Sequence, residues 1–318
     1  MKKSLILFLA ACLILLTGCV KESPEPLFTP PTVAPEDREV VRSADVDGIF
    51  YTLYNDYTCH ITMADSEVYN ASSLALPDKM GEYTVVAIED GVFQNASFTS
   101  VVLPRGLKHL GARAFEHSQL TGIALPASLC SMGEEAFANC VRLGEVTLPA
   151  GIGTVPVGAF YSCRSLKKVV LEEGIHTVDD EAFGDLPALE EISLPQSLCH
   201  VGDFAFWRCN NTALQFTLPQ GIKTVGTAAF RETAWLESLT EEWVIAGQGV
   251  LLRYNGNDPA PVIPAEVRFL SSAFDGKDVE TLTLPLTLEE ASEGALEQSG
   301  VKAVHYEGSV PSLTALKK

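Results

Sequence analysis

The segment 143–163 reads LGEVTLPAGIGTVPVGAFYSC and contains the pattern that decides the fold. Its first residues, up to Leu148, have the spacing of a short strand with one buried face. Pro149 ends this strand, because proline cannot donate a backbone hydrogen bond to a neighbouring strand. The chain then returns to Ala159 and Phe160, an alanine that permits close approach and a phenylalanine that fills the interior. We therefore predict that the segment is one turn of a coil.

The same pattern recurs along the chain, and its clearest marker is the phenylalanine. Phenylalanines stand at positions 93, 115, 137, 160, 183, 206 and 230, at steps of 22 to 24 residues. A period in the low twenties is typical of a solenoid, because each unit is too small to bury its own apolar face and must stack on its neighbours. We expect the strands to stack in parallel about 4.8 Å apart and to form one continuous sheet.

This unit resembles the BspA-like leucine-rich repeats of bacterial surface proteins, and the resemblance extends from about Asp47 to Gly308. Three glycines before the Ala-Phe pair match the family pattern, and two other residues depart from it: Gly133, Gly202, Gly226, and Pro156, Asp179. The resemblance implies a mostly β, right-handed leucine-rich-repeat solenoid. A parallel sheet would line its concave face, with short strands and turns on the convex face.

The first residues have the features of a secretion signal. In residues 1–18, two lysines precede an apolar stretch that is too short to cross a bilayer. The closing Leu-Thr-Gly-Cys resembles the bacterial lipobox, which implies that Cys19 carries the lipid; an ordinary signal peptide with an incidental cysteine is the alternative. Residues 19–44 are rich in proline and lack a hydrophobic period, which predicts an extended tether. We expect an extracytoplasmic protein, lipid-anchored to a bacterial membrane and displayed at the cell surface.

Residues 45–318 are predicted to form the repeat domain, with two departures from the repeat. Residues 45–72 resemble the family's opening hairpin, which caps the first coil. Between Phe230 and Phe274 the step spans two periods without an intervening Ala-Phe pair. Two apolar runs separated by a glycine-rich turn predict a β-hairpin insert at residues 232–260.

Charge and cysteine content exclude several classes of function. The formal net charge of −19 predicts repulsion from nucleic acid and from anionic lipid. Six cysteines follow Cys19, and in an oxidising compartment they could form disulfides: Cys59, Cys130, Cys140, Cys163, Cys199 and Cys209. Three of them occupy one buried slot after the repeat phenylalanine, where a thiol packs as a small apolar group. We favour free thiols, although a bridge between the adjacent Cys140 and Cys163 is geometrically possible.

No catalytic, metal or cofactor site is predicted. His109 and His200 fall in a polar slot on the back of the coil whose occupant varies between repeats. The pair Cys199 and His200 could suggest a nucleophile with its base, but Cys199 also lies in a variable slot. The protein is therefore predicted to be non-enzymatic, with no cofactor and no metal ligands.

The candidate binding surface consists of the outward-facing strand positions. Small side chains occupy one slot and charged or polar side chains another: Thr147, Val170, Ser193, Thr217, and Glu145, Lys168, Glu191, Gln215. Opposite charges should neighbour each other on consecutive strands. This row either only stabilises the sheet or forms a surface on which an extended polymer lies.

The family resemblance implies a surface protein for adhesion or protein–protein interaction, with a protein or extracellular-matrix ligand as partner. Two alternatives stay open at this point: a structural scaffold of the cell envelope, and a carbohydrate-binding accessory lipoprotein. The exposed strand slots lack the aromatic side chains that sugar sites usually present. An aromatic row facing solvent would favour the carbohydrate reading.

Overall fold

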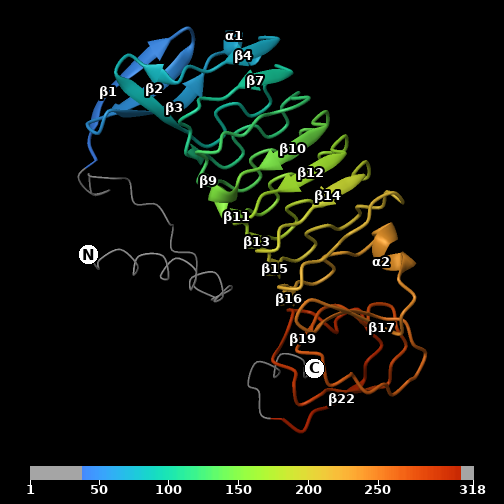
Figure 1. Ribbon diagram of the computed structural model, residues 1–318. Helices are drawn as coiled ribbons and strands as arrows, with labels where there is room; N and C mark the ends of the chain where they lie inside the picture. The colour runs from blue at the N-terminus through green and yellow to red at the C-terminus, as the bar shows by residue number, and fades with distance from the viewer. Residues whose placement is uncertain (1–37, 309–318) are drawn as a thin grey trace, which may run out of the picture.

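The structure, a computed structural model, describes residues 38–308 and is an elongated solenoid of stacked coils (Figure 1). The signal segment 1–18, Cys19 and most of the proline-rich tether lie outside the described residues. The two helices between residues 38 and 308 are α1 (Ser66–Tyr69) and α2 (Ala234–Ser238), and neither is long enough to cross a membrane.

Three antiparallel strands cover the first coil. They are β1 (Val40–Val46), β2 (Ile49–Tyr54) and β3 (Thr58–Ala64), and β2 and β3 pair where the sequence predicts a hairpin. Strand β1 begins inside the segment 19–44 that was predicted to be tether, so this boundary was placed too late. Strand β3 pairs in parallel with β6 (Tyr83–Ile88), and β5 (Lys79–Met80) flanks β6. The cap thereby satisfies the backbone groups of the first coil.

One side of the solenoid, which we call the strand face, is formed by the strands that precede each Leu-Pro pair. These strands are paired in parallel in three groups: β4 (Ser73–Ala75) with β7 (Ser100–Val102); β10 (Glu145–Leu148), β12 (Lys168–Leu171) and β14 (Glu191–Ser193); and β20 (Thr281–Thr283) with β22 (Ala303–His305). The predicted continuous sheet is therefore wrong. The ladder is interrupted at residues 123–125 and again at 215–217.

The opposite side is formed mostly by two-residue strands, in line with the predicted short strands, and Figure 1 shows β11, β13 and β15 across the coil from β10, β12 and β14. Three parallel ladders follow one another along it: β6, β8 (His109–Leu110) and β9 (Ser131–Met132); β11 (Thr154–Val155), β13 (Thr177–Val178), β15 (His200–Val201) and β16 (Thr224–Val225); and β18 (Val250–Tyr254), β19 (Phe269–Leu270) and β21 (Glu290–Ala291). A 3₁₀ turn at Ala150–Ile152 precedes β11, where the second of these ladders begins.

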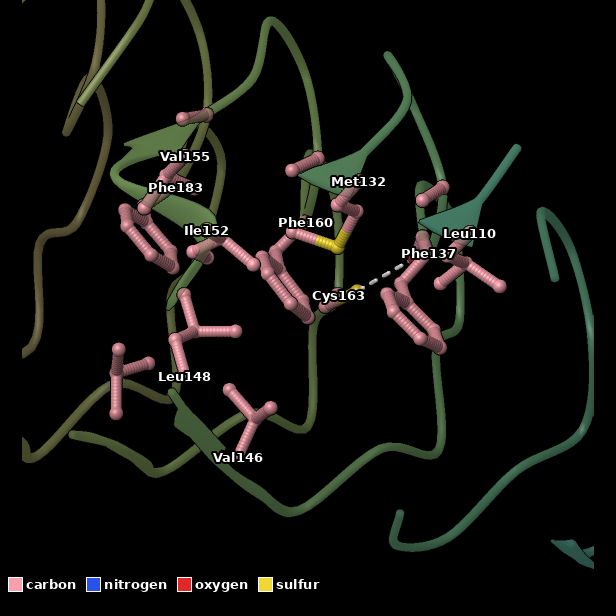
Figure 2. Packing of buried hydrophobic residues seen from close by; sticks show 14 of the residues in the cluster. Leu110, Met132, Phe137, Val146, Leu148, Ile152, Val155, Phe160, Cys163 and Phe183 are labelled. Carbon is pink, nitrogen blue, oxygen red and sulfur yellow. Dashed lines mark hydrogen bonds between the residues drawn. The ribbon is translucent and has the colours of Figure 1, made fainter. Parts of the chain in front are cut away.

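The repeat phenylalanines form a continuous stack through the interior. Adjacent ring centroids from Phe93 to Phe230 lie 5.3–5.6 Å apart, and the ring planes differ by at most 22°. Figure 2 shows Phe137, Phe160 and Phe183 aligned in this way. Burying one phenylalanine contributes about 1.5–3 kcal/mol by transfer alone. The stacked core confirms the prediction that each coil uses its neighbours to bury its apolar face.

The segments around each Ala-Phe pair, which we call Ala-Phe turns, form a further ladder of hydrogen bonds. The backbone N–H of Phe115 donates to the carbonyl of Ala136 at 2.8 Å, and Phe137 donates to Ala159 at 2.9 Å. Residues just before and two positions after this pair, such as Arg113 and His117, have positive φ values of 55° and 58°. Because the backbone conformation alternates from residue to residue in the Ala-Phe turn, every second N–H points toward the next coil. Each turn therefore donates to the turn that follows it.

The cysteine slot also carries hydrogen bonds between coils. Cys163 Sγ donates to the Phe137 carbonyl at 3.0 Å, as the dashed line in Figure 2 shows. Cys140 and Cys209 make the same contact with the carbonyls of Phe115 and Phe183, at 3.1 and 3.2 Å. These three cysteines, together with Cys59 and Cys130, are free thiols, so Cys140 and Cys163 are not bridged. The sixth, Cys199, is disulfide-bonded, so the prediction of a free thiol is wrong for this residue.

The insert divides the solenoid core. After α2, strands β17 (Trp243–Ala246) and β18 form the antiparallel hairpin that the sequence predicts, and β18 then pairs in parallel with β19. Two hydrophobic clusters result: the first contains Trp235 and also Val250, Leu252 and Phe269, and the second contains Leu251, Tyr254 and Phe274. The Trp235 ring lies 5.1 Å from Phe230, and the Tyr254 ring lies 5.3 Å from Phe274. These two side chains extend the aromatic contacts where the Ala-Phe pair is missing, but their ring planes are inclined by 62° and 42° and are not stacked.

Candidate functional site

Six of the eight candidate residues lie together on the three-stranded part of the strand face. Glu145, Lys168 and Glu191 are direct neighbours in the register of β10, β12 and β14. Lys168 Nζ lies 2.8 Å from Glu191 Oε1, and both side chains are largely exposed. An exposed pair of this kind contributes at most about 1 kcal/mol to stability. The lysine therefore stays available to a partner.

The small side chains form a parallel row beside these charges. Thr147, Val170 and Ser193 occupy neighbouring register positions, and all three are at least partly exposed. The alternate residues Val146 and Val169 are buried in the core. This alternation is what a half-buried parallel strand requires. The surface beside the charged row is consequently smooth.

Gln215 and Thr217 do not extend this row as strand residues. Both are exposed, but the segment that contains them forms no strand. Phe216, between them, replaces the valine or isoleucine of earlier coils and packs 5.0 Å from the rings of Phe206 and Phe230. The coil also holds an additional residue, as the step of 24 from Phe206 to Phe230 shows. A larger inward side chain and a longer coil both displace the strand from its register.

The other interruption leaves a shallow hollow on the strand face. This strand-face hollow has a volume of about 260 Å³. Its lining comes from the coil that lacks a strand and from β10 and β12: Ile123, Ala124, Leu125, Glu145, Val146, Thr147, Lys168 and Val170. Ile123 and Leu125 are only partly buried there. The sequence signal for the interruption is Gly122, because glycine weakens a strand interior.

The histidines of the back slot pair across neighbouring strands. His109 Nδ1 lies 2.7 Å from Ser131 Oγ, and His200 Nδ1 lies 2.7 Å from Thr224 Oγ1. Burial lowers the pKa of His109, with the nearby His60 as a second cause. Cys199 Sγ lies 3.1 Å from the Ser197 carbonyl oxygen. These contacts fit polar pairing between coils, as expected for a slot whose occupant varies.

A polar cluster under the cap was not anticipated from the sequence. His60 Nδ1 contacts Glu89 Oε1, and Arg38 Nη2 lies 2.9 Å from His60 Nε2. The hydrogen bond from His60 lowers the pKa of the Glu89 carboxyl below its ordinary value. The Arg38 guanidinium also lies 3.8 Å from the Tyr54 ring centroid and 3.3 Å from Asp56. The cluster joins the cap to the first coil, and within residues 38–308 no three potential ligands gather as a metal site.

Comparison with protein families assigns the repeats. Residues 86–213 match the BspA type leucine rich repeat region in six copies. This part of the chain therefore belongs to the BspA-type leucine-rich repeats, which agrees with the stacked coils described above. No curated protein matches the sequence.

Three solved structures are similar to this chain, and the first of them supports the fold. A leucine-rich repeat protein from Eubacterium ventriosum is 23% identical, with 64% of this chain and 52% of that chain covered, at a TM-score of 0.55. This chain thus spans about half the length of that relative. A leucine rich cell surface protein from Faecalibacterium prausnitzii is 21% identical over 84% of this chain and 77% of its own, at a TM-score of 0.47. The pneumococcal vaccine antigen PcpA is 19% identical over 84% and 71%, at 0.43.

Proposed function

We propose that this protein binds another protein through the strand face while a lipid on Cys19 holds it at the outside of a bacterial cell. The partner is an extended segment of a host-matrix or cell-surface protein. The repeats present a row of outward side chains on a rigid sheet, and leucine-rich-repeat solenoids commonly bind proteins along such surfaces. The protein acts without catalysis in this proposal.

The single observation that carries the proposal is the strand-face hollow beside the charged row. An extended segment can lie across β10, β12 and β14 over Thr147, Val170 and Ser193. A partner side chain can enter the hollow against Ile123 and Leu125. Lys168 at its edge then contributes charge recognition.

The resemblance of residues 16–19 to a lipobox supports the proposed location, and the acidic net charge narrows the ligands. A formal charge of −19 disfavours anionic lipid and nucleic acid as ligands. The proline-rich stretch after Cys19 would hold the repeats away from the membrane. Labelling with a radioactive fatty acid tests the anchor: Cys19→Ser should abolish label and release the protein into the medium.

The interaction itself is tested by charge reversal with a matched control. We would measure Kd for immobilised extracellular-matrix proteins and envelope protein fractions, identify a saturable partner, and compare Lys168→Glu with Lys167→Glu. Lys167 is an adjacent exposed lysine that pairs with Glu190 at 3.4 Å. We expect Lys168→Glu to raise Kd about tenfold, which is about 1.4 kcal/mol. Equal effects of both variants would contradict strand-face binding.

The carbohydrate alternative loses support from the distribution of aromatic side chains. Within residues 38–308 the exposed aromatics are Phe50 in β2 and Tyr57 in the turn between β2 and β3, and both belong to the cap. The candidate positions on the strand face carry none. The envelope-scaffold alternative uses the same surface, so the partner identified in the binding experiment decides between scaffold and adhesin.

A further inference from the structure

A second cavity lies where the insert replaces one Ala-Phe turn. This missing-turn cavity has a volume of about 410 Å³. It lies between the last turn of the first array and the coil that resumes after the insert, and its lining includes Ala228, Phe230, Glu232, Ser272, Asp275 and Lys277. It shares no lining residue with the strand-face hollow. Its size is at the small end of the range for ligand sites.

Two backbone donors at this cavity have no acceptor. In the preceding turn, the N–H of Phe206 donates to Ala229 at 2.8 Å and that of Arg208 donates to Arg231 at 3.0 Å. Phe230 and Glu232 occupy the same two positions one turn later. Among the hydrogen bonds of residues 38–308, none is donated by the backbone N–H of either residue. Both N–H groups therefore face the place where the next turn would supply its carbonyls.

The two parts of the solenoid are joined by serine side chains beside this cavity. The N–H of Ala228 donates to Ser272 Oγ at 2.8 Å, and Ser271 Oγ donates to the Gly226 carbonyl at 2.9 Å. These bonds replace the first rung of the missing turn. Nothing replaces the second and third rungs, at Phe230 and Glu232. The gap is therefore held open by contacts at one end.

We infer that the missing-turn cavity binds a short peptide segment of another protein, whose carbonyl oxygens accept hydrogen bonds from the N–H groups of Phe230 and Glu232. Each earlier turn of the array receives this type of partner from the chain itself. Adding a peptide to unpaired backbone donors is a common recognition mode. The two donors are two residues apart, so alternate carbonyls of one peptide reach both.

The surroundings of the cavity define the peptide. Trp235 and Tyr254 already fill the aromatic positions on either side, so the bound segment carries small side chains there. Acidic and basic side chains both line the site: Glu232, Glu237, Asp275, and Arg231, Arg253, Lys277. This mixed lining suits a neutral backbone with polar flanks better than a free anion.

Amide hydrogen exchange of the full chain, measured by NMR, tests the inference with acetyl-tetraalanine-amide as the probe. We expect saturating peptide to slow exchange at Phe230 and Glu232 at least tenfold. The amides of Phe206 and Arg208 serve as internal controls and should not change. A matched peptide with phenylalanine at its second position should bind at least tenfold more weakly.

A rim substitution provides the matched protein control. Gln298 lines the cavity and is exposed. Gln298→Trp should block peptide protection, whereas Gln298→Ala should preserve it. Peptide binding without protection of the two amides, or their protection before peptide is added, would overturn the inference. If Gln298→Trp does not fold, the exchange experiment on the unaltered chain decides alone. Lys168→Glu leaves this cavity intact, so the outcome is independent of the strand-face proposal.

Discussion

The coils before the insert and those after it have the same repeat but differ in how they are held together. Before it, each Ala-Phe turn from Phe93 to Phe206 donates backbone hydrogen bonds to the next, and the seven phenylalanine rings from Phe93 to Phe230 stack. After it, the aromatic contacts reduce to Trp243, Tyr254 and Phe274, and Leu296 takes the next phenylalanine position. Contacts of Ser271 and Ser272 link the two parts, together with Thr227, whose hydroxyl contacts Ser292 and Glu293. The backbone ladder, more than the leucine pattern, therefore makes the array continuous.

The largest expected loss of stability comes from a substitution at the centre of the first array. Phe160 is fully buried between the rings of Phe137 and Phe183. Phe160→Ala should lower the free energy of unfolding by about 3–5 kcal/mol, because it removes apolar contact and leaves a cavity. Chemical denaturation followed by circular dichroism measures this. Phe274→Ala, in the short part, should leave the unfolding of the first array nearly unchanged; equal effects on that transition would contradict the comparison.

The next largest loss of stability is expected where neighbouring turns pack closely around a glycine. A Cβ at Gly202 would lie 2.6 Å from the backbone nitrogen of Asp180, whereas a Cβ at Gly122 meets no atom within 4 Å. Gly202→Ala should therefore cost about 1–3 kcal/mol, as overpacking does. Gly122→Ala should be neutral or slightly stabilising. Paired denaturation curves check both, and a Gly202→Ala protein of unchanged midpoint would show that the turns are not packed this closely.

Cys209 in the cysteine slot is expected to make the stability of the protein depend on pH. Burial raises the pKa of the Cys209 thiol from 9.0 to about 12. Above pH 9 the unfolded chain ionises this thiol while the folded chain keeps it protonated. The contribution of this thiol to the free energy of unfolding is then fully present below pH 9. It falls by about 1.4 kcal/mol per pH unit as the pH rises toward 12. Denaturation midpoints of the parent and Cys209→Ser between pH 8 and about 10.5 measure this.

A matched cysteine separates this effect from general alkaline unfolding. Cys209→Ser keeps a donor for the Phe183 carbonyl and should reduce the alkaline loss. Cys130 is exposed, so Cys130→Ser should leave the pH dependence unchanged. Identical pH profiles for the parent and Cys209→Ser would rule out ionisation of this thiol as a cause.

The smallest expected effect concerns the joint between the two parts. Ser272→Ala removes the acceptor for the Ala228 N–H and should cost about 1 kcal/mol. Its more specific consequence is a separation of unfolding into two transitions, since the later coils lose a contact with the first array. Differential scanning calorimetry resolves them. A single unsplit transition of lowered midpoint would indicate that other contacts couple the two parts.

The sequence predicts the stacked coils because one inward residue, the phenylalanine, recurs at nearly every turn. It also predicts the insert, since two apolar runs flank Gly247 and Gly249. The two interruptions of the strand face were missed. They depend on single residues within an otherwise regular pattern, Gly122 in one coil and Phe216 in another. The strand-face hollow follows from the first interruption, so it could not be located without coordinates.

The cysteine slot illustrates a second limit. Its apolar neighbours and its position after the phenylalanine predict a small buried side chain. The hydrogen bond from Cys163 to the Phe137 carbonyl depends on the direction of the carbonyl, which the pattern does not encode. Leu186 in the same slot cannot make this bond. The six clustered candidate residues were predicted as neighbours because their register follows from the period, whereas Gln215 and Thr217 were misplaced by the longer coil.

Amide hydrogen exchange along the free full chain tests the central claim most directly, because it reads the backbone ladder turn by turn. We expect strong protection at the amides of Phe115, Phe137, Phe160, Phe183 and Phe206, and much faster exchange at Phe230, where the next turn is absent. Protection at Phe230 equal to that at Phe206 would contradict the account, because the ladder would then continue through the insert.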